Sequence, residues 1–249
     1  MLSLFQMKLL REHGGFGRTG GGAAQPAAAY TPPRAARALG AQELFGAAPG
    51  ARLYAAGDVA LLGAPIVAVV GSRRASPEGL RRARQLARDL ARGGVVVMSG
   101  LAAGIDRAVH EATIAHGGRT VAVVGTPLEG AYPAENAALQ ERIYREHLLL
   151  SPFGPGTRTH PSHFPARNRV MARLARATVV VEAGDASGSL HQVAESVRAG
   201  RPVFVARSVA SNPRLAWPAR YLREPLVQVL DASAQVIEAA LSAGVDDAA

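Results

Sequence analysis

The chain has 249 residues, a hydrophobic fraction of 48% and a formal net charge of +9. This length allows one sizeable domain with extensions, or two small domains, and the apolar fraction is enough for a buried core. The chain contains no cysteine, which excludes disulfides, cysteine-based zinc sites and thiol catalysis. No apolar run approaches the roughly 18 residues that span a bilayer. We therefore expect no membrane association and, without an export signal, a cytoplasmic protein.

The basic charge balance favours polyanionic partners, mainly nucleic acid. Nearly all of the positive charge is arginine, because Lys8 is the only lysine. Arginine suits phosphate recognition because its planar fork donates two parallel hydrogen bonds. A coding bias toward arginine, alanine and glycine explains the same composition without any partner. The charge alone therefore indicates nucleic-acid binding without establishing it.

Composition divides the chain into three parts. The segment from His13 to Pro33 is rich in glycine, alanine and proline and has no hydrophobic period, which predicts a flexible linker. We therefore expect a low-complexity, flexible extension over residues 1–49. A folded, nucleic-acid-binding domain is predicted over residues 50–230, with residues 34–62 as a lead-in packed on it. Residues 231–249 are expected to form a C-terminal helix and a tail that is frayed from Asp246 onward.

Between residues 65 and 206, short and uniformly apolar runs alternate with mostly helical stretches. The runs are Ile66–Val70, Val95–Met98, Thr120–Val124, Leu148–Leu150, Thr178–Val181 and Pro202–Val205, and Leu226–Leu230 is a candidate for one more. Such runs are typical of strands that are covered on both faces. The alternation predicts an α/β class with a mostly parallel sheet and helices on both faces. Ligands are then expected at the carboxyl ends of the strands, where the strand order reverses.

The helix predicted after the first of these runs has two distinct faces. One carries an apolar stripe of Leu80, Ala83, Ala87 and Leu90. The other carries four arginines at helical spacing, namely Arg81, Arg84, Arg88 and Arg92. The apolar stripe is the side expected to pack on the sheet.

Two glycine-containing turns follow predicted strands. The first is Gly71-Ser72-Arg73, and the second runs from Ser99 and Gly100 to Gly104. Glycine lets backbone N–H groups approach an anion, and a helix N-terminus adds partial positive charge. The glycine spacing does not fit the dinucleotide fingerprint, and no acidic residue is placed to hold a ribose. We therefore expect an anion cradle without a bound cofactor, the alternative being plain tight turns.

A third motif combines an aromatic ring with arginine guanidinium groups, in the segment Phe164-Pro165-Ala166-Arg167-Asn168-Arg169. A ring beside arginines can stack a base and clamp its phosphates. The alternative is a solvated basic helix, Arg169, Arg173 and Arg176, with Phe164 in the core. The motif by itself supports these two interpretations equally.

The remaining polar groups give weaker signals. Ser187-Gly188-Ser189 follows a predicted strand and opens a helix, where hydroxyls and amides can meet an anion. Glu182 and Glu195 can be read as an acid/base pair, although solvation or pairing with neighbouring arginines is favoured. His160 and His163 lie in a proline-rich loop without partners at ligand spacing, so no metal site is predicted. No catalytic residue is assigned.

Taken together and in order, these motifs resemble the bacterial DNA-processing protein A family, also called Smf. Each motif is weak by itself, whereas the ordered set is specific. The resemblance covers about residues 50 to 206 and rests on Val67–Arg73, Ser99–Asp106 with His110, Tyr132-Pro133, Phe164–Arg169 and Ser187–Leu190.

The resemblance implies an extended Rossmann-like fold that binds single-stranded DNA without sequence preference and is not an enzyme. Such proteins protect incoming DNA in natural transformation, load the RecA recombinase and commonly form homodimers. Carried over by position, the DNA-binding residues are Gly71, Ser72, Arg73, Ser99, Gly100, Gly104, Phe164, Arg167, Asn168, Arg169, Ser187 and Ser189. Among them Phe164 is expected to stack a base, and Ser187 and Ser189 to lie at the rim of the pocket.

Two alternatives remain at this stage. The first is a binder or hydrolase of small nucleotides, like the related phosphoribohydrolases of the Lonely Guy type. Their Pro-Gly-Gly-x-Gly-Thr loop is missing here, since the corresponding residues read Ser187-Gly188-Ser189-Leu190. The second is a divergent paralogue that binds a protein partner, because the segment from Asn212 to Leu222 does not match the usual family continuation.

Overall fold

The computed structural model describes residues 31–33, 36–40 and 52–242 of the chain. The predicted flexible linker up to residue 30 and the predicted frayed tail from residue 246 lie outside these residues. The three-part division of the chain stays a prediction.

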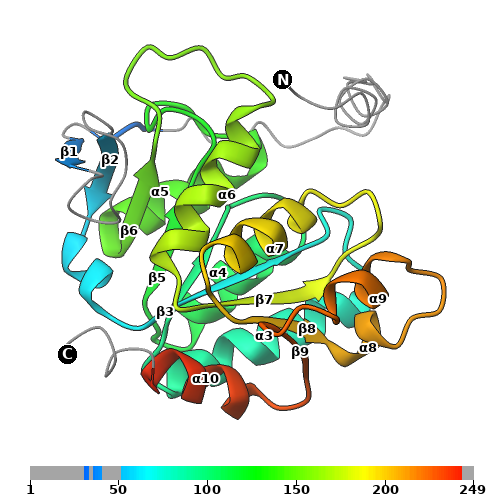
Figure 1. Ribbon diagram of the computed structural model, residues 1–249. Helices are drawn as coiled ribbons and strands as arrows, with labels where there is room; N and C mark the ends of the chain where they lie inside the picture. Colours follow the sequence, from blue (N-terminus) through cyan, green and yellow to red (C-terminus); the bar gives the residue numbers. More distant parts are fainter. Residues whose placement is uncertain (1–30, 34–35, 41–51, 243–249) are drawn as a thin grey trace.

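Within the described residues, the strands form one nine-stranded sheet in the order β1-β2-β6-β5-β4-β3-β7-β8-β9 (Figure 1). Every pair from β6 to β9 is parallel, while β1 and β2 are antiparallel additions beside β6. The predicted α/β class with a mostly parallel sheet is thus confirmed. The strands are β1 (Arg37–Gly40), β2 (Arg52–Gly57), β3 (Ile66–Gly71), β4 (Val96–Ser99), β5 (Thr120–Val123), β6 (Leu148–Ser151), β7 (Ala177–Glu182), β8 (Val203–Ala206) and β9 (Val227–Leu230).

Helices cover both faces of this sheet, as the sequence predicts. Residues of β3 alternate between the two faces: Val67 and Val69 pack on one side, Ala68 and Val70 on the other. The first face carries α3 (Pro77–Arg92), α4 (Ile105–Ala115), α5 (Ala137–Glu146) and α10 (Ser233–Ser242). The second face carries α6 (His163–Leu174), α7 (Ser189–Arg198), α8 (Arg207–Ala210) and α9 (Trp217–Tyr221). Two short 3₁₀ helices, Val59–Gly63 and Ala134–Asn136, complete the described elements.

Tertiary contacts position the segment between β8 and β9, for which the hydrophobic pattern of the sequence predicts no helix. The carboxylate of Asp185 accepts hydrogen bonds from the backbone N–H groups of Ala216 and Trp217, each at 2.9 Å. The Trp217 indole is buried and donates to the Ala183 carbonyl at 3.1 Å. These contacts tie α9 to the loop that follows β7.

The strand order reverses between β3 and β7, because the chain builds outward from β3 toward β6 and then from β7 toward β9. Loops at the carboxyl ends of β3 and β7 therefore depart toward opposite faces of the sheet, to α3 and α7. This is the place where open α/β sheets bind their ligands. In the part of the chain that the structure describes, no helix is both long and apolar enough to cross a membrane.

Candidate nucleic-acid interface

The predicted site segments meet at the carboxyl edge of the sheet. The backbone N–H of Ser72 donates to the Glu182 carbonyl at 2.7 Å, which joins the loop after β3 to β7. The Ser72 carbonyl accepts the Ile105 N–H at 3.1 Å, and the Ser189 hydroxyl donates to the Gly71 carbonyl at 3.0 Å. The turns after β3, β4 and β7 are therefore one connected assembly, as expected for a site at a strand-order reversal.

The glycines of these turns allow close packing of protein on protein. A Cβ at Gly104, which has a φ of +76°, would lie 2.3 Å from the Ser72 carbonyl oxygen. A Cβ at Gly71 would lie 2.5 Å from the Ile105 side chain. The Ile105 amide, at the start of α4, is occupied by the Ser72 carbonyl. The expected cradle of free amides around an anion is thus at least partly filled by the chain itself.

Arg167 is a buried structural donor, with only 6% of its surface exposed. Its Nη1 donates to the carbonyls of Gly100 and Val123 at 2.5 Å each, and its Nε donates to Asn168 Oδ1 at 3.1 Å. A Cβ at Gly100 would lie 2.0 Å from Nη1, so only glycine leaves room for the guanidinium. Arg167 thus joins α6 to the ends of β4 and β5.

Burial and neighbouring charges shift the pKa values of Arg167 and Asp106. Burial lowers the pKa of Arg167 to about 10, against the opposing effect of the Asp106 carboxylate. Burial likewise raises the pKa of Asp106, while the charge on Arg167 lowers it. Asp106, in the first turn of α4, accepts the Ala102 N–H at 3.4 Å. The two opposite charges offset part of the cost of burying each other.

Three other predicted site residues are also engaged within the protein. Ser99 is fully buried and donates to the Val69 carbonyl at 2.6 Å. Asn168 donates to the Gly188 carbonyl at 3.4 Å, and the Ser187 hydroxyl donates to that of Ser189 at 3.1 Å. These side chains fix the loops in place. Any effect that the buried Ser99 and Asn168 have on a ligand passes through the shape of the site, whereas Ser187 is partly exposed.

The side chains that face outward form a cation–aromatic cluster of Arg73, Tyr132 and Phe164. The guanidinium carbon of the exposed Arg73 lies 5.5 Å from the centre of the Phe164 ring. The Tyr132 ring lies 5.5 Å from that of Phe164, with an angle of 48° between the planes. Among the described residues, Tyr132 and Leu241 are the large apolar side chains that are exposed, Tyr132 at 42%. A Cβ at Gly125 would lie 2.7 Å from the Phe164 ring, so glycine there lets the ring settle over the end of β5.

Tyr132 was missed as a site residue by reasoning from residue types, although Tyr132-Pro133 belongs to the motif set of the resemblance. The available signal was a lone aromatic in a polar loop after a buried strand. Arg169, five residues along α6 from Phe164, is exposed and remains available to a ligand, as is Arg74 beside Arg73. The cluster can therefore stack a planar ring while arginines meet an anion.

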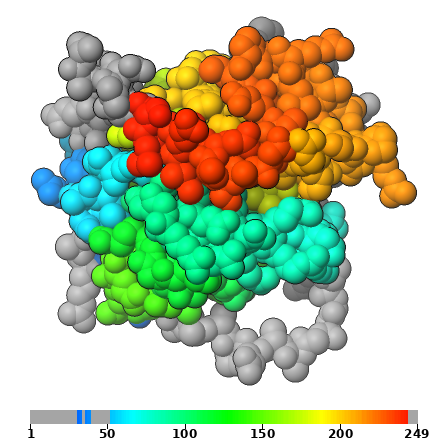
Figure 2. Space-filling view, turned by 90° about the horizontal axis from the view of Figure 1, so that it is seen from below, coloured from blue at the N-terminus to red at the C-terminus, as the bar shows by residue number. Residues whose placement is uncertain are grey.

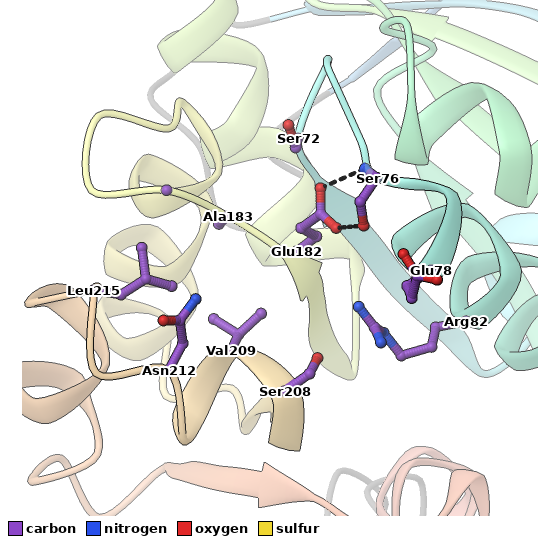
Figure 3. A pocket seen from close by; sticks show the side chains of 11 residues that line it. Ser72, Ser76, Glu78, Arg82, Glu182, Ala183, Ser208, Val209, Asn212 and Leu215 are labelled. Atoms are coloured by element: carbon purple, nitrogen blue, oxygen red, sulfur yellow. Dashed lines mark hydrogen bonds between the residues drawn. The ribbon is translucent and has the colours of Figure 1, made fainter.

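A cavity of about 410 Å³ opens beside the loop that follows β3 (Figure 3). Its walls come from that loop, the start of α3, the end of β7 and α8. Glu182 lines it and accepts hydrogen bonds from the Ser76 N–H at 2.9 Å and the Ser76 hydroxyl at 2.5 Å. Glu195 instead pairs with Arg198 on α7 at 2.5 Å. Each carboxylate of the possible acid/base pair thus has its own structural partner.

His160, in the loop before α6, and His163, the first residue of α6, both make ring contacts. His163 stacks on Phe153 with ring centres 3.8 Å apart, and His160 lies edge-on to His163 at 6.3 Å. Among the described residues, no group of three or more His, Asp or Glu side chains is arranged to hold a metal ion.

His110 lies in the core beneath the interface. Its Nδ1 is 2.7 Å from the Thr120 hydroxyl, which itself donates to the Val97 carbonyl, so Nδ1 carries the proton. Burial of the ring, with a further effect from His147, lowers the pKa of His110 to about 3. The imidazole is therefore neutral in the folded protein near neutral pH.

This fold and site define a Rossmann-like protein with a cation–aromatic surface at the switch point of its sheet. The sequence profile described as DNA recombination-mediator protein A matches residues 40–240. The chain therefore belongs to that family, and the predicted resemblance is confirmed.

Individual relatives agree with this assignment. DNA processing protein DprA of Streptococcus pneumoniae is 45% identical over 152 residues, which is 61% of this chain and 54% of the relative. Its crystal structure superposes with a TM-score of 0.69 at 38% identity, covering 75% of this chain and 65% of that chain. DNA processing protein A of Helicobacter pylori, studied for its single-stranded DNA binding mode, gives a TM-score of 0.72 at 26% identity, covering 83% and 96%. This chain thus spans about half the length of the pneumococcal relative.

We expect Gly100→Ala to destabilise the protein by about 1–3 kcal/mol, the usual cost of forcing extra volume into a packed site. The added methyl group collides with the guanidinium of Arg167 and so weakens its bonds to the carbonyls. Gly63→Ala is the matched control, because a Cβ there meets nothing within 4 Å. Urea unfolding of both variants measures the difference, and equal stabilities would contradict the packing role of Gly100.

The neutral His110 makes stability depend on pH. Its pKa is about 3 in the folded protein and near the ordinary histidine value of 6.5 in the unfolded chain, so the unfolded state binds more protons between these values. Stability contributed by this group is present above about pH 6.5 and is lost as the pH falls. We expect His110→Gln to reduce the loss of unfolding free energy between about pH 7 and pH 5 by about 2 kcal/mol. Urea titrations at both pH values measure it, and an unchanged pH dependence would contradict a buried neutral imidazole.

Proposed function

We propose that this protein binds single-stranded DNA without sequence preference, in the cytoplasm and without catalysing a reaction. The observation that carries the proposal is the outward-facing cluster of Arg73, Tyr132 and Phe164 at the switch point of the sheet. A base of any identity has a π-face to stack on such rings, at about 1–3 kcal/mol per base. The single-stranded DNA binding described for the Helicobacter pylori relative supports the same ligand.

The predicted site residues divide by role in this proposal. Arg73, Phe164, Arg169 and the rim residue Ser187 contact the strand, together with Tyr132. The others hold the loops that present them: Gly71, Ser72, Ser99, Gly100, Gly104, Arg167, Asn168 and Ser189. For Arg167 and Ser99 this division follows from burial, because their exposed fractions are 6% and 0%. For the partly exposed Gly71, Ser72 and Gly104 it follows from their contacts within the protein.

The proposal also includes a cellular role, namely the one that membership of this family implies. We propose that the protein protects incoming single strands during natural transformation, loads the RecA recombinase onto them and acts as a homodimer. The family description as a recombination mediator supports a partner in recombination. Because the chain covers only 54% and 60% of the relatives from Streptococcus pneumoniae and Bacillus subtilis, these roles rest on a shared domain.

We expect Phe164→Ala to weaken binding of oligo-dT by about 1–3 kcal/mol, through loss of the ring on which a base stacks. Arg73→Glu should weaken binding further and flatten its dependence on salt, because a phosphate contact becomes a repulsion. Fluorescence anisotropy across a series of salt concentrations measures both effects. Arg142→Glu serves as the charge control, since Arg142 is an exposed arginine on α5, paired with Glu146.

Circular dichroism melting of each variant confirms that the fold is intact. Unchanged affinity in both Phe164→Ala and Arg73→Glu would show that the strand binds elsewhere. A salt-independent affinity of the unsubstituted protein, or equal affinity for duplex and single strand, would contradict the proposed ligand itself.

A second candidate function is binding of a small nucleotide, which the cavity beside Glu182 favours by its place at the switch point. The absence of the Pro-Gly-Gly loop opposes hydrolysis of such a nucleotide. Incubation of the protein with AMP, followed by chromatographic detection of free adenine, tests whether it hydrolyses such a nucleotide. Release of adenine at a rate that scales with protein concentration would replace the DNA-binding proposal, and no release is the expected result.

A further inference from the structure

The solvent face of α3 carries a straight row of arginines. Arg81, Arg84, Arg88 and Arg92 recur at intervals of three and four residues, so a 3.6-residue helical period places them along one side. The opposite side is buried in the core through Ala83, Leu86, Ala87 and Leu90. At a rise of 1.5 Å per residue, the row extends for about 16 Å along the helix. We call these four residues the α3 arginine row.

Two members of the row differ from the arginines of neighbouring helices in their partners. On α4 and α5, Arg107, Arg142 and Arg145 each pair with a glutamate four residues away. In the α3 arginine row, Arg81 pairs with Glu78 and Arg88 with Asp89, whereas the structure gives Arg84 and Arg92 no carboxylate partner within 4 Å among the described residues. Both side chains are exposed. Uncompensated guanidinium groups at a surface attract phosphate.

The surroundings leave this face open and positive. Figure 2 shows α3 as a turquoise band at the surface between α10, in red, and the green segments that include α4. The Asp89 carboxylate accepts a hydrogen bond from Ser233 of α10 at 3.0 Å, in addition to its contact with Arg88. On α4, Glu111 is paired with Arg107. Asp89 and Glu111 are therefore engaged, and the five arginines of α3 exceed its two acids by three charges.

The row begins next to the proposed interface. Ser76 caps α3 through a hydrogen bond from Gly79 at 3.0 Å, and Glu182 fixes the same serine to the end of β7. The loop that precedes this cap carries Arg73 over the Phe164 ring, and the exposed Arg74 follows. A strand that leaves the cation–aromatic cluster along this loop meets the first turns of α3 directly.

We propose that the α3 arginine row is a second binding surface, which holds the phosphate backbone of single-stranded DNA as it leaves the cation–aromatic cluster. This inference rests on the proposed function and deepens it, because it assigns the path of the strand beyond the cluster. Arg84 and Arg92 bind phosphates by charge and paired hydrogen bonds, without contact to bases. The cluster supplies stacking, and the row supplies length-dependent, salt-sensitive affinity.

The test compares two double variants that remove equal charge. Arg84→Ala/Arg92→Ala removes the two unpaired members of the row, and Arg142→Ala/Arg145→Ala removes two paired arginines of α5. Alanine favours the helical state, so both variants should fold, which melting curves check. Anisotropy then measures affinity for an oligo-dT of about 4 nucleotides, confined to the cluster, and for one of about 16 nucleotides.

We expect the α3 variant to bind the longer oligonucleotide about tenfold more weakly at low salt and the shorter one with unchanged affinity. The slope of log affinity against log salt should fall by about 1.4, since each single-strand phosphate contact contributes about 0.7. Equal binding of the longer oligonucleotide by both double variants would overturn the assignment of the row and leave the proposed function standing. Failure of the unsubstituted protein to bind either oligonucleotide would instead overturn the proposed function, and the row with it.

Discussion

The interface depends on one buried guanidinium, that of Arg167. It joins three separate elements, because its Nη1 reaches carbonyls at the ends of β4 and β5 while its backbone belongs to α6. A buried guanidinium is stable only when its N–H groups have acceptors and an opposite charge lies near. Here the acceptors are the two carbonyls and Asn168, and Asp106 supplies the opposite charge. Removing any of these partners leaves an uncompensated buried group. The position of α6, and with it that of Phe164, follows from this arrangement.

The glycines and the exposed cluster are consequences of the same constraint. Gly100 leaves room for the guanidinium, and Gly125 leaves room for the Phe164 ring that α6 carries over β5. Once these elements are fixed, Arg73 and Tyr132 meet the ring from two other loops. The protein thereby holds the aromatic surface in a preformed arrangement. Because these side chains are already ordered, binding a ligand there costs less conformational entropy. The contrast between the buried Arg167, which joins three elements, and the exposed Arg73 and Arg169 is the main feature of the site.

Much of the fold follows from local pattern, whereas the roles of individual side chains do not. The uniformly apolar runs predicted the parallel strands to within one or two residues, because strands covered on both faces have no polar side to interrupt them. The strand β2, which lies between β1 and β6, and the helices α8 and α9 escaped prediction. Contacts between distant parts of the chain position them, such as the pairing of β2 with β6 and the hydrogen bond from the Trp217 N–H to Asp185. Likewise, Arg167 and Arg169 look alike in sequence, and only the packing of α6 separates a buried donor from an exposed one.

The central claim is that Arg73 and Phe164 present one surface to a DNA strand. A crystal structure of the protein with a short oligo-dT tests this claim most directly. The account predicts a thymine stacked on the Phe164 ring, its phosphate within hydrogen-bonding reach of the Arg73 guanidinium, and Arg167 still bonded to Gly100 and Val123. A strand bound with its bases away from Phe164, or an Arg167 turned outward to hold phosphate, would contradict it.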